Sequence, residues 1–94
     1  MYRKAVAAYE AARDAFLAEV AAGERHGVIA EIGDAFGTSL NELDLRAQFI
    51  ETEEREELFD ALDFLVDETQ TRVGRDLSAA RAVLIEAVDA VHDW

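Results

Sequence analysis

Apolar residues recur every three or four positions through most of this 94-residue chain, and this spacing restricts what the chain can fold into. Along an α-helix such residues form one stripe, which can be buried against other helices. The sequence contains five glycines and no proline to interrupt the pattern. The spacing therefore predicts an all-α fold, namely a small antiparallel helical bundle of three long helical elements.

The first two helices are expected to form a hairpin around Gly23. One apolar stripe predicts a helix over about residues 2–22, which Gly23 would end. A second stripe predicts a short helix from Val28 that ends at Gly37. Gly27 and Gly33 each lower the stability of this helix by about 1 kcal/mol relative to alanine. We therefore expect them to allow a neighbouring helix to approach closely.

Residues 38–51 allow two interpretations. Ser39 and Glu42 have the spacing of a capping box, which predicts the start of a short helix. From Leu43 to Phe49, however, apolar residues alternate as in an extended segment. The pattern leaves open whether this part is a short helix or an ordered crossing loop.

Two long helices are predicted in the second half of the chain. Thr52 is a suitable N-cap for a helix over residues 52–73, and Gly74 would end that helix. The last helix is expected over about 77–92. Because the chain contains no internal repeat and no flexible linker, residues 1–94 are expected to form a single domain.

The charge of the chain limits its partners. Nine basic residues stand against 21 acidic ones, which gives a net charge of −12. Such a surface repels nucleic acids and anionic membranes. We therefore expect no nucleic-acid partner and no membrane partner, and instead a protein partner or self-association.

The composition also indicates a habitat and a compartment. Alanine, valine and acidic residues are abundant and Lys4 is the only lysine, which resembles the proteins of salt-accumulating haloarchaea. Concentrated salt would screen the repulsion within so acidic a chain. No apolar run has the length of a membrane span or the form of a signal peptide, and the chain lacks cysteine. These features predict a cytoplasmic protein.

The first third of the chain resembles an uncharacterised archaeal family of small helical-bundle proteins, a domain of unknown function. That family has an acidic residue before alanine, a Gly-acidic turn, and an Ala-rich helix that ends in an aromatic residue and glycine. The matching residues are Asp14, Ala15, Gly23, Glu24, Ala30, Ile32, Ala35, Phe36 and Gly37. The resemblance implies a three-helix bundle of archaeal origin with no known activity.

A second resemblance concerns metal chemistry. "AEIGDAFG" and "EELFDALDFLVDETQTRVGRDL" resemble the two carboxylate motifs of MazG-type nucleotide pyrophosphohydrolases. The resemblance implies that Glu31, Asp34, Glu57 and Asp60 hold Mg²⁺ against a nucleoside triphosphate. Carboxylates at i and i+3 share a helix face, and the metal would orient an attacking water. Two features depart from that family: Asp34 replaces its usual Glu, and no cluster of basic residues is evident.

Other charged groups have simpler interpretations. Asp60, Asp63 and Asp67 could form a cation site or a docking face for a basic partner, but a solvated acidic surface is the favoured interpretation. Arg72 and Arg75 flank Gly74 and would be the candidate site for an anion. The favoured interpretation there is pairing with nearby carboxylates or with the negative end of the preceding helix.

The remaining polar residues do not suggest a catalytic set. His26 and His92 lie far apart in the sequence, and His92 is expected to interact with a helix C-terminus. Asp76 and Ser78 are expected at a helix start. The leading hypothesis is therefore a non-enzymatic protein without a cofactor, which acts through protein–protein contact or homo-oligomerisation. The alternative is a Mg²⁺-dependent pyrophosphohydrolase.

Overall fold

In the computed structural model, which describes residues 3–47 and 52–92, the chain forms four α-helices. They are α1 (Arg3–Ala22), α2 (His26–Ala47), α3 (Thr52–Val73) and α4 (Ser78–Val91). The all-α fold class is confirmed for these residues. The expected number of three long helical elements is wrong, because α2 is as long as α3.

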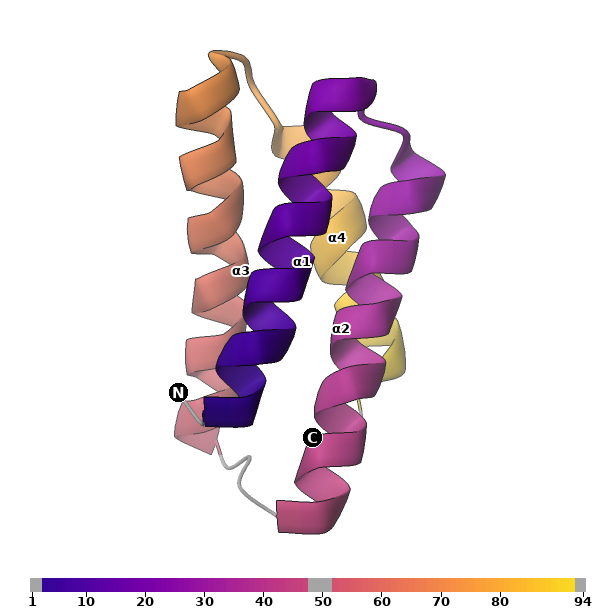
Figure 1. The fold of residues 1–94 in the computed structure, drawn as a ribbon, viewed down its shortest axis with the longest axis vertical. Helices are drawn as coiled ribbons and strands as arrows, with labels where there is room; N and C mark the ends of the chain where they lie inside the picture. The colour runs from indigo at the N-terminus through magenta and orange to yellow at the C-terminus, as the bar shows by residue number, and fades with distance from the viewer. Residues whose placement is uncertain (1–2, 48–51, 93–94) are drawn as a thin grey trace.

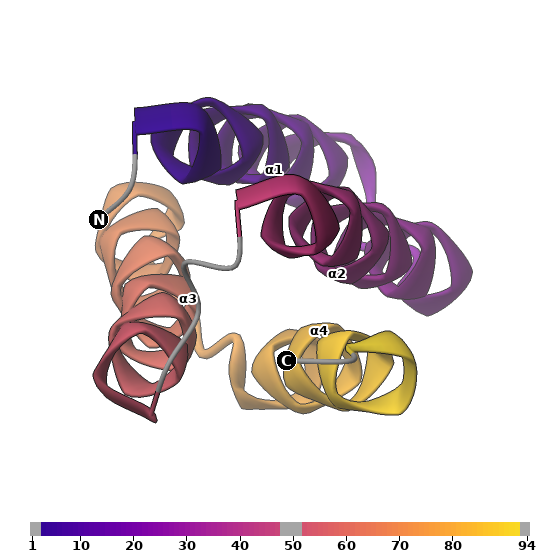
Figure 2. The ribbon, with the colours of Figure 1, turned by 90° about the horizontal axis from the view of Figure 1, so that it is seen from below.

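The four helices surround one core and alternate in direction (Figure 1). Viewed along the bundle, α1 lies beside α2 and α3, and α4 completes the square beside the same two helices (Figure 2). Consecutive helices α2 and α3 therefore occupy opposite corners. The first two helices form the predicted hairpin, with Gly23 directly after α1.

Buried apolar side chains from all four helices make up the core. Most of them belong to the stripes that the spacing predicts. They are Ala5, Ala12, Phe16 and Val20; Ile29, Phe36 and Leu40; Leu58, Leu62, Leu65 and Val66; and Leu77, Ala80, Leu84 and Val88. Thr69 is also buried, and its hydroxyl donates to the Leu65 carbonyl at 2.8 Å.

The predicted end of the second helix at Gly37 is wrong. α2 continues through Gly37 to Ala47, so of the two alternatives the extended segment is wrong up to that residue, and the helix start predicted at Ser39 lies inside α2. Positions 48–51 lie outside the described residues. A Cβ at Gly37 would lie 2.6 Å from Val91 Cγ2. Gly37 therefore makes room for α4 instead of ending α2, and the buried Leu40 in the following turn holds the helix on the core.

Gly33 has the same role as Gly37. A Cβ there would lie 2.7 Å from the Leu84 carbonyl oxygen and 2.8 Å from Ala87 Cβ. The expected close helix approach is thus confirmed for Gly33. It is wrong for Gly27, where a Cβ would meet nothing within 4 Å.

Charged side chains join the two turns at one end of the bundle. Arg25 donates from Nε and Nη2 to the Glu19 carboxylate at 3.0 and 2.9 Å, and its backbone amide donates to the same group at 2.9 Å. Arg75, from the turn between α3 and α4, donates to the Val20 carbonyl at 2.9 Å and to Glu24 at 3.1 Å. The two helical hairpins are therefore linked at this end.

The start of α4 is held as the sequence predicts. Asp76 accepts from the Ser78 amide at 3.0 Å and from the Ser78 hydroxyl at 2.6 Å. These bonds lower the pKa of Asp76, the side-chain bond most. Within the described part of the chain, none of the helices is long and apolar enough to cross a membrane.

Candidate functional site: a groove between α1 and α3

The four carboxylates suggested as metal ligands lie on two helices that are not neighbours. Glu31 and Asp34 are exposed on α2, and Glu57 and Asp60 are exposed on α3. These helices stand at opposite corners of the bundle (Figure 2). The structure therefore does not bring the two pairs together.

Metal-ligand geometry is also absent elsewhere in residues 3–47 and 52–92. No three Asp, Glu, His or Cys side chains of this part lie close enough to hold one metal ion. A hard cation such as Mg²⁺ needs several oxygens converging on one point. The described residues thus do not fit the Mg²⁺ that the pyrophosphohydrolase resemblance implies.

Glu31 has a different environment from the one expected. It lies at the edge of a shallow apolar groove of about 240 Å³ between α1 and α2. Small side chains line most of this groove, including Ala8, Ala11, Ala15 and Ala35. The groove reflects how few large side chains cover the α1–α2 face.

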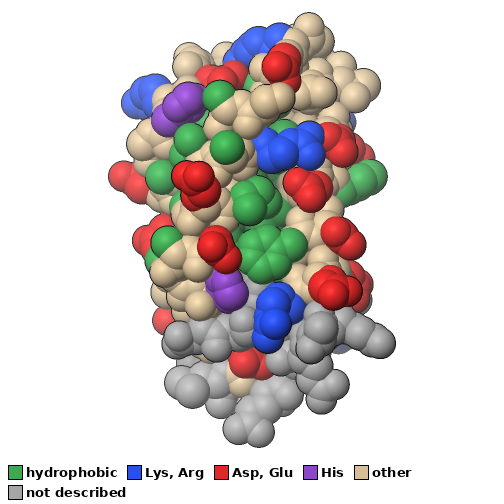
Figure 3. Space-filling model, turned by 180° about the vertical axis from the view of Figure 1, so that it is seen from behind, with side chains coloured by type: hydrophobic (Ala, Val, Ile, Leu, Met, Phe, Trp, Pro, Cys, Tyr) green, Lys and Arg blue, Asp and Glu red, His purple; other side chains and the backbone are tan. Residues whose placement is uncertain are grey.

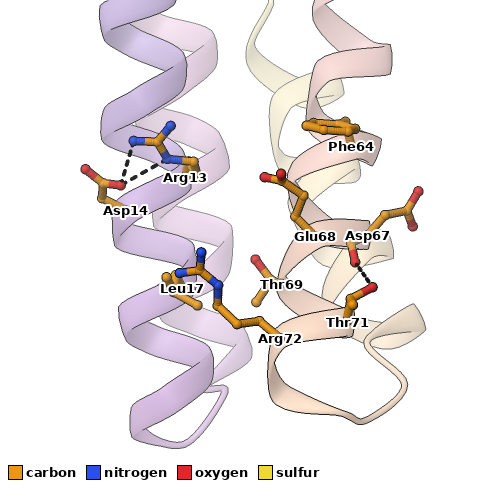
Figure 4. A pocket seen from close by; sticks show the side chains of 9 residues that line it. All are labelled: Arg13, Asp14, Leu17, Phe64, Asp67, Glu68, Thr69, Thr71 and Arg72. Carbon is orange, nitrogen blue, oxygen red and sulfur yellow. Dashed lines mark hydrogen bonds and ion pairs between the residues drawn. The ribbon is translucent and has the colours of Figure 1, made fainter.

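A larger groove of about 800 Å³ lies between α1 and α3 (Figure 4). Both helices contribute charged, hydroxyl and apolar side chains to it. Its lining residues are Arg13, Asp14, Leu17, Phe64, Asp67, Glu68, Thr69, Thr71 and Arg72.

Phe64 is the apolar feature of this groove. Its side chain is 58% exposed, and no other large hydrophobic residue of the described ranges is classed as exposed. Phe64 falls outside the Leu58–Val73 stripe and is therefore not among the predicted core or site residues. Its place in the sequence nevertheless indicates its exposure, because a large aromatic residue outside the buried stripe of a helix points to the surface.

The charges in the groove differ in how they are paired. Arg13 contacts the Asp14 carboxylate at 3.1 Å, and Asp67 pairs with Arg81 of α4. Within the described part of the chain, neither the Glu68 side chain nor the Arg72 side chain makes a hydrogen bond or an ion pair. Figure 4 shows the Arg72 side chain extending from α3 toward α1, below Glu68.

Glu68 also influences a tyrosine on the opposite helix. Burial raises the pKa of the Tyr9 hydroxyl, and the negative charge of Glu68 raises it further. In Figure 4 the Glu68 carboxylate points from α3 toward α1. Its negative charge therefore faces the groove.

The other candidate charges are used mainly in pairing. Asp63 and Asp67 both pair with Arg81. The favoured interpretation of the arginine pair is confirmed for both residues, because Arg75 pairs with Glu24 and Arg72 lies in the last turn of α3, at its negative end. His92 directly follows α4, and its Nε2 lies 3.1 Å from the Asp89 carboxylate. Its ring packs edge-on against the Phe59 ring, with the two ring centroids 5.5 Å apart. On the face where α4 is nearest the viewer, acidic side chains flank a row of hydrophobic ones (Figure 3).

No family model, curated protein or solved structure matches the chain. The α1–α3 groove is therefore the feature of the molecule that bears on function. Its side chains can supply an aromatic anchor, one free cation and one free carboxylate among the described residues. Such a combination is suited to binding another protein surface.

Proposed function

We propose that the chain is a non-enzymatic protein of the cytoplasm that acts through protein–protein contact, with the α1–α3 groove as its binding surface. The observation that carries this proposal is the exposure of Phe64 at the edge of the groove. An aromatic ring of this kind is a typical anchor of a protein interface, because its burial in a partner removes a large apolar area from water.

The surrounding charges support the same function. A protein interface commonly combines an apolar centre with a polar rim. Here Leu17 and Phe64 provide the apolar groups, and Arg13, Glu68 and Arg72 surround them. The acidic surface elsewhere would then keep the chain from binding other acidic proteins and nucleic acids. No observation favours the pyrophosphohydrolase alternative over this one.

Site-specific photo-crosslinking tests the proposal. The photoreactive residue p-benzoylphenylalanine would replace Phe64, where it keeps an aromatic ring in the groove. The matched control places the same residue at Asp34, which is exposed on α2, diagonally across the bundle. We expect a covalent adduct with a protein from position 64 and none from position 34.

A second substitution makes this experiment specific for the groove. Leu17→Ser, combined with the photoreactive residue at position 64, should abolish the adduct, because Leu17 lines the same groove from α1. An adduct that forms equally from both positions, or that survives Leu17→Ser, would contradict the proposal. The absence of any adduct from position 64 would contradict it as well.

A further inference from the structure

Glu68 and Arg72 are opposite charges one helical turn apart on α3. Both are exposed, and among the described residues neither has an ion-pair partner. Four residues of helix correspond to a rise of roughly 6 Å. A glutamate four residues before an arginine is well placed for a pair within the helix, yet in the structure Arg72 extends toward α1 instead (Figure 4). Both charges are thus available to a partner.

We infer that the partner in the α1–α3 groove is a second copy of this chain, related to the first by a two-fold axis. The inference rests on the proposed function of the groove. An axis that crosses α3 at right angles, level with residue 70 and on the side of the helix that carries Glu68 and Arg72, sets the two α3 helices antiparallel. Glu68 of each copy then lies opposite Arg72 of the other. A two-fold interface requires this reciprocity, because residue i must contact residue j in both directions.

The charge distribution selects a second copy over other partners. A basic partner would be repelled by Arg72 and an acidic one by Glu68, because these are the two groove charges without an ion-pair partner among the described residues. A second copy presents both signs in the matching order. The carboxylate–guanidinium pairs that result are strong and directional, and there are two of them. The groove also contains two arginines beside three carboxylates, so its own charge is close to balanced although each chain carries −12.

The same arrangement accounts for Phe64. It lies one turn before Glu68, so the two-fold axis places it beyond Arg72 of the other copy, opposite residue 76 in the turn that follows that α3. Leu17 lies at this end of the groove (Figure 4). Two phenylalanines, one from each copy, would thereby be removed from water.

A charge-swap experiment tests the pairing. Sedimentation velocity over a range of concentrations would compare the wild-type chain with Arg72→Glu and Glu68→Arg, at about 0.15 M KCl. At this ionic strength the Debye length of about 8 Å screens distant repulsion but leaves contact pairs effective. Each variant places like charges at both contacts of its own dimer. We expect the dimer dissociation constant of each to rise at least about tenfold.

Mixing the two variants is the decisive step. In the mixed dimer, one copy carries glutamate at both positions and the other carries arginine at both, so the two contacts are attractive again. We expect the mixture to recover dimers with a dissociation constant near that of the wild type. Recovery cannot result from misfolding, and circular dichroism of each variant alone checks its helix content. Asp34→Arg changes the net charge as Glu68→Arg does, at an exposed site on α2, and should leave the dimer intact.

The outcomes separate the two proposals. A wild-type chain that stays monomeric at every concentration overturns the second-copy inference, while a groove-specific adduct with another protein would leave the proposed function standing. A dimer that is indifferent to both charge reversals, or that mixing fails to restore, also overturns the inference. Failure of crosslinking at position 64 together with a persistent dimer would show that the dimer uses another face.

Discussion

Glu19 shows how a single acidic residue can connect two helices of this chain. Only 6% of its surface is exposed, and it accepts three hydrogen bonds from Arg25. One of these comes from the backbone amide that precedes the first turn of α2, so the carboxylate caps the helix although it belongs to α1. The backbone amides of Gly23 and Glu24 both donate to the Glu19 carbonyl, and these two bonds close the turn between α1 and α2.

Stability should therefore depend on the ionisation of Glu19. The Arg25 side chain, and next its backbone amide, lower the pKa of Glu19 in the folded chain. Because the pKa of Glu19 is lower in the folded chain than in the unfolded chain, ionised Glu19 stabilises the fold. This stabilisation is fully present above the pKa of the unfolded chain, about 4.3, and is lost as the pH falls through the pKa of the folded chain. We expect Glu19→Gln to have a lower free energy of unfolding than the wild type at pH 7. The difference between the two free energies should shrink below about pH 4.

Urea unfolding at a series of pH values, at constant KCl, measures this difference. Comparison with the variant is needed because acidification also relieves repulsion among the other carboxylates. Glu10→Gln is the matched control, because Glu10 is exposed and only approaches Arg13, at 3.9 Å. A difference for Glu19→Gln that stays constant from pH 7 to pH 3 would contradict the assignment.

Single residues were predictable from the sequence where their partner is local. Asp76 and Ser78 were correctly placed at a helix start because both members of the contact lie within two residues. Arg25 and Glu19 are six residues apart across a turn, and their pairing depends on the turn geometry. The exposure of Phe64 could be read from its place outside the buried stripe, but the groove that Phe64 and Glu68 form with α1, about 50 residues away, could not.

At the scale of the elements, the contact of α2 with α4 is the most extensive in the bundle. Gly33 and Gly37 lie one turn apart on α2 and face the backbone of α4 and Val91. Small residues four apart let two helix axes approach, so that backbone atoms of one helix touch the other. The cost of glycine inside α2 is offset by this packing.

Two glycine-to-alanine substitutions should change stability in opposite directions. Gly33→Ala forces a Cβ against the Leu84 carbonyl and Ala87, and overpacking of this kind costs about 1–3 kcal/mol. The higher helix propensity of alanine returns at most about 1 kcal/mol. Gly27→Ala gains propensity without a contact and should be neutral or stabilising by up to about 1 kcal/mol.

Chemical unfolding of both variants in the same buffer tests this contrast. The two changes are identical in chemistry and lie on the same helix, so only the contact with α4 differs. If Gly33→Ala were as stable as Gly27→Ala, the close approach of α2 to α4 would be wrong.

Helix positions were predicted well and one helix end was not. The ends of α1, α3 and α4 agree with the predicted ranges to within one residue. α2 was cut short because glycine at a helix end and glycine at a helix contact look alike in a sequence. The distinguishing fact is the proximity of α4, which lies about 50 residues further along the chain.

For the whole molecule, the order of the helices around the core decides which side chains can meet. Periodicity predicts which face of each helix is buried, but not which helices become neighbours. A motif on α2 and a motif on α3 looked like two halves of one metal site until the diagonal placement of these helices separated them. The α1–α3 groove could not be predicted for the same reason.

The net charge of −12 is a property of the whole molecule and leads to the last prediction. Repulsion among 21 acidic residues opposes the compact state, and salt shortens the Debye length from about 10 Å at 0.1 M to about 3 Å at 1 M. The thermal midpoint should therefore rise between 0.1 M and molar KCl. In a chain of this size each 1 kcal/mol of relieved repulsion raises it by about 4–8 °C, and we expect at least that.

A neutralised variant separates charge screening from a general effect of salt on apolar burial. Asp34, Asp60 and Glu86 are exposed, and no ion pair joins them to a described residue. The triple substitution Asp34→Asn, Asp60→Asn and Glu86→Gln should raise the midpoint at 0.1 M KCl and reduce its further rise in molar KCl. Potassium chloride favours apolar burial equally in both chains, so an unchanged salt dependence would show that repulsion is not what salt relieves. The thermal midpoint is thus measured against KCl concentration for the wild type and for the triple variant. The difference between the two salt dependences shows how far the stability of this fold depends on concentrated salt.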